Sequence, residues 1–134
     1  MIGVINILKV DAPVTARIGT GADARVYPLE REQEADLPAV TVDQTDIDPS
    51  DTKSGVSSLD EEIVTVTSYD SVFSSCRSLA DDCRAALDRA SGTHGGVVIQ
   101  SNGIQFLNEF VDKEEVNNAK VFFIEQNYKV RVER

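Results

Sequence analysis

Residues 70–90, which read DSVFSSCRSLADDCRAALDRA, decide the fold. Their apolar side chains recur at steps of three and four residues, the spacing of one face of an α-helix. The apolar positions are Val72, Phe73, Cys76, Leu79, Ala80, Cys83, Ala86, Leu87 and Ala90. Charged residues occupy the other face: Arg77, Asp81, Asp82, Arg84 and Asp88. We predict an amphipathic helix that is capped by Asp70 or Ser71, ends before Gly92 and packs on a sheet.

The segments around this helix are typical of strands. Near the C-terminus, Phe122, Ile124, Tyr128, Val130 and Val132 alternate with polar side chains, which indicates an antiparallel strand with one covered face. Residues 39–43, 62–69 and 97–99 are rich in β-branched side chains. In the segment after Gly103, a predicted bulge, Ile104, Phe106 and Phe110 are expected to share one face. The polar residues 112–118 are expected to form a turn.

The N-terminal residues predict two short helices. Ile2, Ile5 and Leu8 mark one face of the first, and Asp11 is the expected N-cap of the second, which Gly19 ends. Residues 25–28 form a short strand or an extended anchor before a charged loop at 29–36. The fold class is therefore α+β. We predict one domain over residues 1–134, with an antiparallel or mixed sheet of four to five strands. The long helix and the short N-terminal helices cover one face of that sheet.

The charge is concentrated in one third of the chain. The net charge is −10, which argues against a surface that binds nucleic acid. Residues 30–62 contain eleven Asp or Glu and two Lys or Arg. No stretch approaches the roughly 18 apolar residues of a membrane helix, so no membrane partner is expected. The apolar start lacks a basic region before it and a cleavage site after it, which favours a cytoplasmic protein over a secreted one.

Residues that could support catalysis are scarce. His94 is expected to be an exposed loop residue, and no hydrolase, phosphate-loop or zinc-protease motif is present. Cys76 and Cys83 lie about 10 Å apart along one helix, beyond the ~7 Å limit of a disulfide, and are expected to be buried free thiols. Asp46, Asp48 and Ser50 resemble the start of a calcium loop, but Asp51 and Ser57 break its pattern. We predict no enzyme, no cofactor and no metal.

Residues 44–60 carry the main candidate site. They have no periodicity, and we predict a long protruding loop, which is uncommon in a compact domain unless it is functional or mobile. Isolated apolar residues in such a segment are often buried when a partner binds, although they could equally pack on the same domain. The candidate partner or oligomer interface consists of Asp46, Ile47, Asp48, Asp51, Val56 and Leu59.

The order of these features resembles a known family. A first helix ends in a Leu-x-x-Asp pattern at 8–11, and a second helical turn at 14–19 ends in glycine. Arg-Val-Tyr-Pro at 25–28, Leu-Pro-Ala-Val-Thr-Val at 37–42 and Tyr-Lys-Val-Arg-Val at 128–132 follow. The chain resembles the tail completion, or tail-to-head joining, proteins of long-tailed phages, which are relatives of the lambda tail terminator.

This resemblance implies a structural virion protein without catalytic residues or cofactor. It implies a homo-oligomer, a hexameric ring that caps the tail tube, ends its polymerisation and joins the tail to the head. The partners would be the major tail tube protein and the head–tail connector or neck protein, and genomic DNA would pass through the lumen without specific binding. Assembly would occur in the host cytoplasm, with the ring at the head-proximal end of the tail. The alternatives are a neck or head-closure protein and a small cytosolic binding or regulatory module.

Overall fold

The computed structural model describes residues 2–20, 24–28, 37–52, 55–116 and 119–133; for residues 46–52, 55–59 and 116 it describes the backbone alone. The charged loop predicted at 29–36 therefore lies outside the described residues. The elements in chain order are α1 (Ile2–Val10), α2 (Ala12–Ile18), β1 (Val26–Pro28), β2 (Ala39–Thr52), β3 (Gly55–Asp70), α3 (Phe73–Leu87), β4 (Gly92–His94), β5 (Val97–Val116) and β6 (Ala119–Glu133).

The strands form one mixed sheet of six strands in the order β1-β2-β3-β6-β5-β4. β1 is parallel to β2, and every other neighbouring pair is antiparallel. The α+β class is confirmed, but the prediction of four to five strands is wrong. The additional strand, β4, pairs with the start of β5 across Gly95 and Gly96, whose φ angles are 60° and 79°. Two consecutive residues with positive φ suit a two-residue hairpin turn, which glycine forms without strain.

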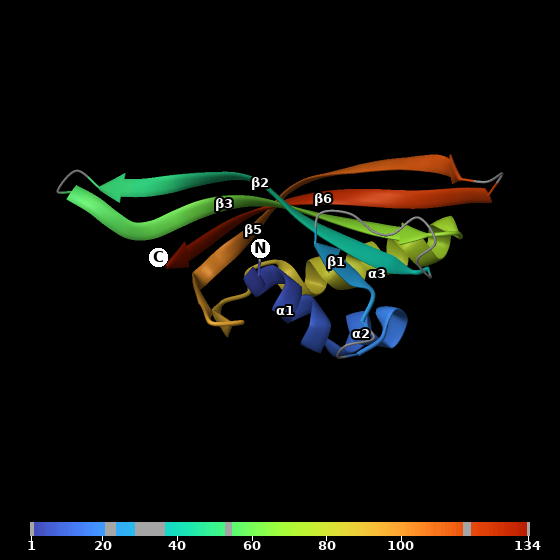
Figure 1. Cartoon of the computed structure of the whole chain (residues 1–134), viewed down its shortest axis with the longest axis horizontal. Coiled ribbons are helices and arrows are strands. Elements are labelled where there is room, and N and C mark those ends of the chain that lie inside the picture. The colour runs from blue at the N-terminus through green and yellow to red at the C-terminus, as the bar shows by residue number, and fades with distance from the viewer. Residues whose placement is uncertain (1, 21–23, 29–36, 53–54, 117–118, 134) are drawn as a thin grey trace.

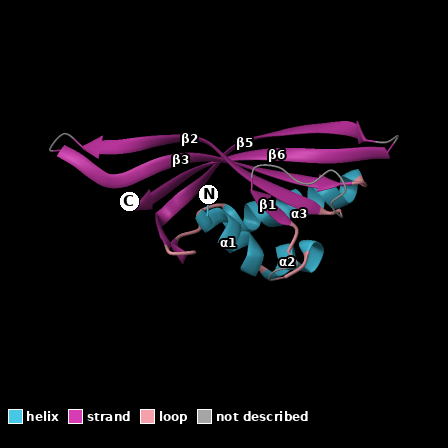
Figure 2. Cartoon of the chain, in the orientation of Figure 1, coloured by secondary structure: helices cyan, strands magenta, loops and turns pink. Residues whose placement is uncertain are grey.

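The three helices lie on one face of the sheet (Figure 2). The apolar face of α3 supplies five of the buried residues between the layers: Cys76, Leu79, Ala80, Cys83 and Leu87. The alternation predicted for β6 is confirmed, since Ile124, Tyr128, Val130 and Val132 are buried on the helical face. None of the described helices is long and apolar enough to span a membrane.

The ends of α3 differ from the prediction. The N-cap position is Val72, whose side chain cannot cap, and the Asp70 carboxylate instead accepts a hydrogen bond from the Ser71 N–H. Val72 and Phe73, predicted on the buried face, are exposed: Val72 is the N-cap and Phe73 is the first residue of the helix. The helix ends at Leu87 rather than near Gly92, because Arg89 has a φ of 65° and its N–H bonds to the Ile104 carbonyl.

The first N-terminal helix buries Leu8 as predicted, but the rest of its buried face differs from the prediction. Gly3, Val4, Ile7 and Leu8 are buried in α1, whereas Ile2 is exposed and Ile5 is half-buried. Steps of one, three and one place the buried residues on a single helical face, and Ile2 and Ile5 lie at its margins. In α2 the predicted cap is confirmed: Asp11 accepts a hydrogen bond from the Val14 N–H. Gly19 ends this helix with a φ of 91°.

The long loop predicted at residues 44–60 is wrong, because these residues belong to a β-hairpin. β2 and β3 pair from Ala39↔Tyr69 to Thr52↔Gly55, with register shifts between Gln44 and Asp46 and between Ser50 and Thr52. The pairing uses backbone groups, so a segment of Asp, Ser and Pro residues can extend a ladder that its apolar neighbours begin. Figure 1 shows this hairpin extending past the helices on one side of the molecule.

β5 is longer and less regular than predicted. Gly103 lies at the predicted bulge, between the paired residues Ile99 and Ile104. A second register shift, between Phe106 and Asn108, moves Phe110 to the face opposite the helices. The prediction that Phe110 shares a face with Ile104 and Phe106 is therefore wrong. The turn predicted at 112–118 is also mostly strand, since β5 and β6 pair as far as Val116↔Ala119.

Candidate assembly surface

The two long hairpins extend in opposite directions from the helix-covered centre of the sheet (Figure 1). One consists of β2 and β3, and the other of β5 and β6. Among the described residues, β1 pairs with β2 only as far as Val42, and β4 pairs with β5 only as far as Ile99. The outer edges of both hairpins therefore have backbone N–H and C=O groups without a strand partner in the part of the chain that the structure describes. Such edges are the usual sites at which a further strand or subunit adds to a sheet.

The β2–β3 hairpin contains all the predicted interface residues. Asp46, Ile47 and Asp48 are register partners of Ile63, Glu62 and Glu61. Leu59 pairs with Ser50 and with Glu133, the last described residue of β6. Asp51 lies in β2 and Val56 in β3, beyond this last pair with β6. The six residues therefore share one ribbon, whose outer part is paired only with itself among the described residues.

The base of this hairpin is held by charges that sequence analysis missed. Glu61 forms ion pairs with Lys129, at 3.5 Å, and with Arg131, at 3.2 Å. Arg131 is 70 residues from Glu61 in the chain, so only the sheet register brings the two together. The acidic ribbon is thus neutralised where it joins the rest of the sheet. The clustering of acids was the sequence signal, but it did not identify their partners.

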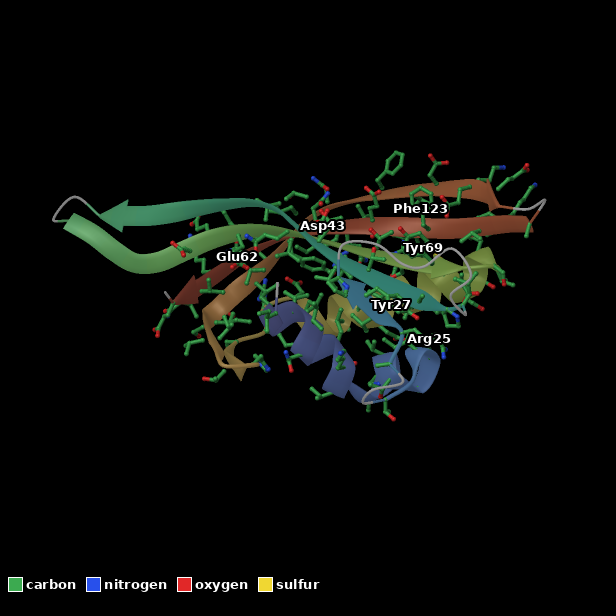
Figure 3. All side chains as sticks on the ribbon, in the orientation of Figure 1. Arg25, Tyr27, Asp43, Glu62, Tyr69 and Phe123 are labelled. Atoms are coloured by element: carbon green, nitrogen blue, oxygen red, sulfur yellow. The ribbon has the colours of Figure 1, made fainter. Side chains whose placement is uncertain are left out.

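The face of the sheet opposite the helices, which we call the outer face, is polar and aromatic. Tyr69 and Phe123 are register partners with ring centroids 6.0 Å apart (Figure 3). Two rows further along this face is a hydrogen-bonded chain, in which Thr65 donates to the Asn127 side chain at 2.6 Å and Asn127 donates to Asn108 at 2.7 Å. Such cross-strand pairs stabilise a sheet face that has no helical layer over it.

Apolar side chains are exposed around the β5–β6 hairpin. Phe110 is 54% exposed on the outer face, and Leu107 and Val111 are 46% and 43% exposed. Phe73, at the start of α3, is 44% exposed and contacts the Phe122 ring at 5.9 Å. These side chains lie on both faces of the hairpin, since Phe110 pairs with Glu125 on the outer face and Val111 pairs with Ile124 on the helical face. Exposed apolar groups of this kind are candidate protein–protein contacts. The sequence prediction had placed Phe110 on the same face as Ile104 and Phe106 and therefore missed its exposure.

A polar network joins the β5–β6 hairpin to α3. Arg77 makes two hydrogen bonds to Glu109, at 2.6 and 3.1 Å, and one ion pair to Asp81 at 2.8 Å. Buried Gln126 donates to Glu109 at 3.4 Å and accepts a hydrogen bond from the Tyr128 hydroxyl at 3.0 Å. The hydrogen bond from Arg77 lowers the pKa of Glu109, and the same bond raises the pKa of Arg77. These contacts fix the angle between hairpin and helix.

The cysteines match a structural role. Both are buried and free, as predicted. Burial raises the pKa of Cys76 to about 11 and that of Cys83 to about 12, so both remain neutral thiols at physiological pH. His94 lies at the end of β4, half-buried rather than in an exposed loop, with Nε2 2.8 Å from the Ser91 carbonyl. The described residues contain no group of three or more His, Cys, Asp or Glu that could hold a metal ion.

The comparisons with known proteins agree with this architecture. In the solved structure "Virion of native gene transfer agent (GTA) particle", one chain has the same fold, with a TM-score of 0.69 at 20% identity. The match covers 98% of this chain and 92% of that one. No curated protein matches the sequence. The sequence profile of the tail completion protein gp17 family matches residues 3–133, almost the whole chain. The chain therefore belongs to the tail completion protein gp17 family and is a structural phage tail protein.

Proposed function

We propose that the protein forms a hexameric ring that caps the tail tube, ends tube polymerisation and provides the tail-side joint to the head. Membership of the tail completion family supports a role at the end of the tail. The shared fold with a chain of a virion particle is consistent with a place in the virion. In this proposal the protein acts by assembly, without catalysis or a cofactor.

The observation that carries the proposal is a pair of hairpins on opposite sides of the sheet, whose outer edges have no strand partner among the residues that the structure describes. A ring requires a heterologous interface, in which one side of a subunit meets the other side of the next. The β2 edge and the β5 edge lie on different strands at opposite sides of the sheet order. Ring closure would cover edges that otherwise invite uncontrolled strand pairing.

The proposed ring lies at the head-proximal end of the tail and assembles in the host cytoplasm. Its partners are the major tail tube protein on one side and the head–tail connector or neck protein on the other. Asp46, Ile47, Asp48, Asp51, Val56 and Leu59 contribute to a partner or subunit contact through the β2–β3 hairpin. Genomic DNA passes through the lumen without specific binding, in keeping with a net charge of −10, which repels phosphate.

Shortening the β2–β3 hairpin tests this proposal. Residues 51–58 are replaced by Asn-Gly, which favours a two-residue turn and connects Ser50 directly to its register partner Leu59. All pairs between β3 and β6 are retained, so the subunit is expected to fold. In cells that supply the remaining tail proteins, we expect tubes of uncontrolled length or tails that fail to join heads.

Asp46→Asn with Asp48→Asn leaves the ribbon at full length and removes two carboxylates of the proposed contact, so it separates the effect of charge from that of length. Tail length is measured by negative-stain electron microscopy. Tails of normal, controlled length with the shortened hairpin would refute a role for this hairpin in termination. Tails of normal length that never join heads when the whole protein is absent would instead support a neck or head-closure protein.

A further inference from the structure

A cleft of about 480 Å³ lies between the end of α3 and the irregular part of β5. It is lined by Arg84, Asp88, Arg89, Asn102, Gln105 and Phe106. The guanidinium groups of the two arginines and the side-chain amides of Asn102 and Gln105 provide hydrogen-bond donors. Asp88 contributes the one negative charge of the lining. The cleft is therefore a local basic site on a chain whose net charge is −10.

The arginines of this cleft are held by contacts that leave their charge available. The Arg84 guanidinium carbon lies 3.7 Å from the centre of the Phe106 ring, and Phe106 contacts the buried Tyr128 ring edge-on at 5.7 Å. Stacking orients the guanidinium plane and leaves its N–H edge free to bind a carboxylate. Arg89 is positioned by its backbone, whose N–H donates to the Ile104 carbonyl at 2.7 Å.

The other guanidinium groups of the described residues already have partners. Arg17 pairs with Asp82, Arg77 with Asp81 and Glu109, and Arg131 with Glu61. Arg25 donates to the carbonyls of Pro38 and Arg17. Arg84 and Arg89 make no ion pair with any residue that the structure describes, and Asp88 instead accepts a hydrogen bond from the Phe106 N–H at 3.4 Å. In so acidic a chain, two such arginines beside one cleft indicate a carboxylate partner from outside.

The β2–β3 hairpin is rich in carboxylates. Residues 43–62 contain seven Asp or Glu and one Lys, on a ribbon that extends past the helices (Figure 1). We infer that the cleft formed by Arg84 and Arg89 receives the acidic β2–β3 hairpin of a second copy of this chain. The inference rests on the proposed ring, where each subunit would present a hairpin to one neighbour and a cleft to the other. Paired arginines bind carboxylates with defined geometry, which would set the angle between subunits.

Charge exchange between two variants tests this contact. The cleft variant carries Arg84→Glu and Arg89→Glu, and the hairpin variant carries Asp46→Lys, Asp48→Lys and Asp51→Lys. Each alone places like charges opposite one another and is expected to reduce the assembled fraction by about tenfold or more. Mixing the two in equal amounts restores opposite charges at every interface of a ring in which the two variants alternate, and is expected to recover assembly. Native mass spectrometry measures the oligomers, and complementation of tails is scored in parallel by microscopy.

Two further variants separate assembly from folding. Lys9→Glu reverses a charge on α1, outside both hairpins and the cleft, and is expected to assemble like the wild type. Arg89→Asn removes one charge and suits the positive φ of this position, so it is expected to weaken assembly without lowering the thermal midpoint.

The outcomes distinguish this contact from the proposed ring. If the wild type neither forms rings nor completes tails, the proposed function fails. If the wild type and both charge variants assemble alike, the hairpin–cleft contact is wrong while the ring stands. A cleft variant that stays defective when mixed with the hairpin variant would show that the cleft binds another protein. If the cleft variant assembles like the wild type but loses binding to duplex DNA, the cleft binds phosphate groups instead of the hairpin.

Discussion

Arg77 connects two elements that are adjacent in space but distant in the chain. Its partner Glu109 lies 32 residues away on β5, and their side chains are 31% and 27% exposed. Because this pair lies partly out of solvent and has two hydrogen bonds, it stabilises the fold more than an isolated surface pair would. The network continues through buried Gln126 to Tyr128, so one pair links the surface of α3 to the core.

Glu109→Gln is expected to lower the free energy of unfolding at pH 7 by about 0.5–1 kcal/mol, since it removes the partly exposed ion pair between Arg77 and Glu109. The pKa of Glu109 is depressed in the folded state, so its stabilising effect is complete above the unfolded pKa, near 4.5. The effect is lost as the pH falls through the folded pKa. Urea unfolding at pH 7 and at low pH measures this change. If the free energies of unfolding of the wild type and the variant differ by the same amount at both pH values, the Arg77–Glu109 pair is not the source of the difference.

Cys76 and Cys83 are expected to resist thiol reagents in the folded protein. Burial raises both pKa values above 10, so the reactive thiolate is scarce and the reagent cannot reach either sulfur. With an aromatic disulfide reagent at pH 8, both thiols should react only when denaturant unfolds the chain. Rapid reaction of either thiol without denaturant would show that α3 separates readily from the sheet.

At the level of single residues, the sequence predicted positions set by local periodicity. The two buried cysteines of α3 and the alternation of β6 follow from spacings of three to four and of two residues. The faces of Phe110 and Ile2 were predicted wrongly. One extra residue at Leu107 reverses the face of Phe110, and a bulge of this kind leaves little trace in composition. The Glu61 ion pairs depend on register between distant strands, which a local pattern does not encode.

The bulge at Gly103 is the feature of β5 most sensitive to substitution. A Cβ at this position would lie 2.5 Å from the Gln100 carbonyl oxygen and 3.0 Å from the Gln100 nitrogen. Both are backbone atoms, so relief would require the strand itself to move. Gly103→Ala is expected to destabilise the fold by about 1–3 kcal/mol, as overpacking does. Thermal unfolding measures this loss, with exposed Ser101→Ala as the control; equal stability of both variants would show that the bulge adjusts freely.

Among whole elements, the β2–β3 hairpin shows why part of the candidate site could not be predicted. Residues 44–60 lack the alternation of a half-buried strand, so their sequence indicated a loop. The ladder forms nevertheless, because backbone pairing propagates outward from the buried residues Val40, Val42, Val64 and Val66. The acidic composition correctly drew attention to this segment as a distinct region. Its role in an interface remains a prediction.

For the molecule as a whole, the central distinction is between surfaces that fold the subunit and surfaces that assemble it. The helical face of the sheet is filled by the three helices and contains the main buried cluster. The outer face, the free strand edges and the exposed apolar residues near β5 make no such contribution to the core. If these surfaces serve assembly, substitutions there should change tails without changing subunit stability.

Phe106 and Phe110 make this test with a matched pair, since they lie four residues apart on opposite faces of β5. Phe110 is 54% exposed, so Phe110→Thr should change the free energy of unfolding by no more than about 0.5 kcal/mol. Phe106 packs against the main core, and Phe106→Thr should cost up to about 3 kcal/mol.

We expect the two defects to separate when denaturant unfolding of each subunit is compared with microscopy of complemented tails. Phe110→Thr should yield a stable subunit that completes few tails, because the contact with a neighbouring subunit or with the tube loses the exposed phenyl group of Phe110. Phe106→Thr should yield an unstable subunit whose tail defect is relieved only in part at lower temperature, because Phe106 also orients Arg84 of the proposed cleft. Normal tails from Phe110→Thr would exclude Phe110 from the interface and leave the β2–β3 hairpin as the surface to examine.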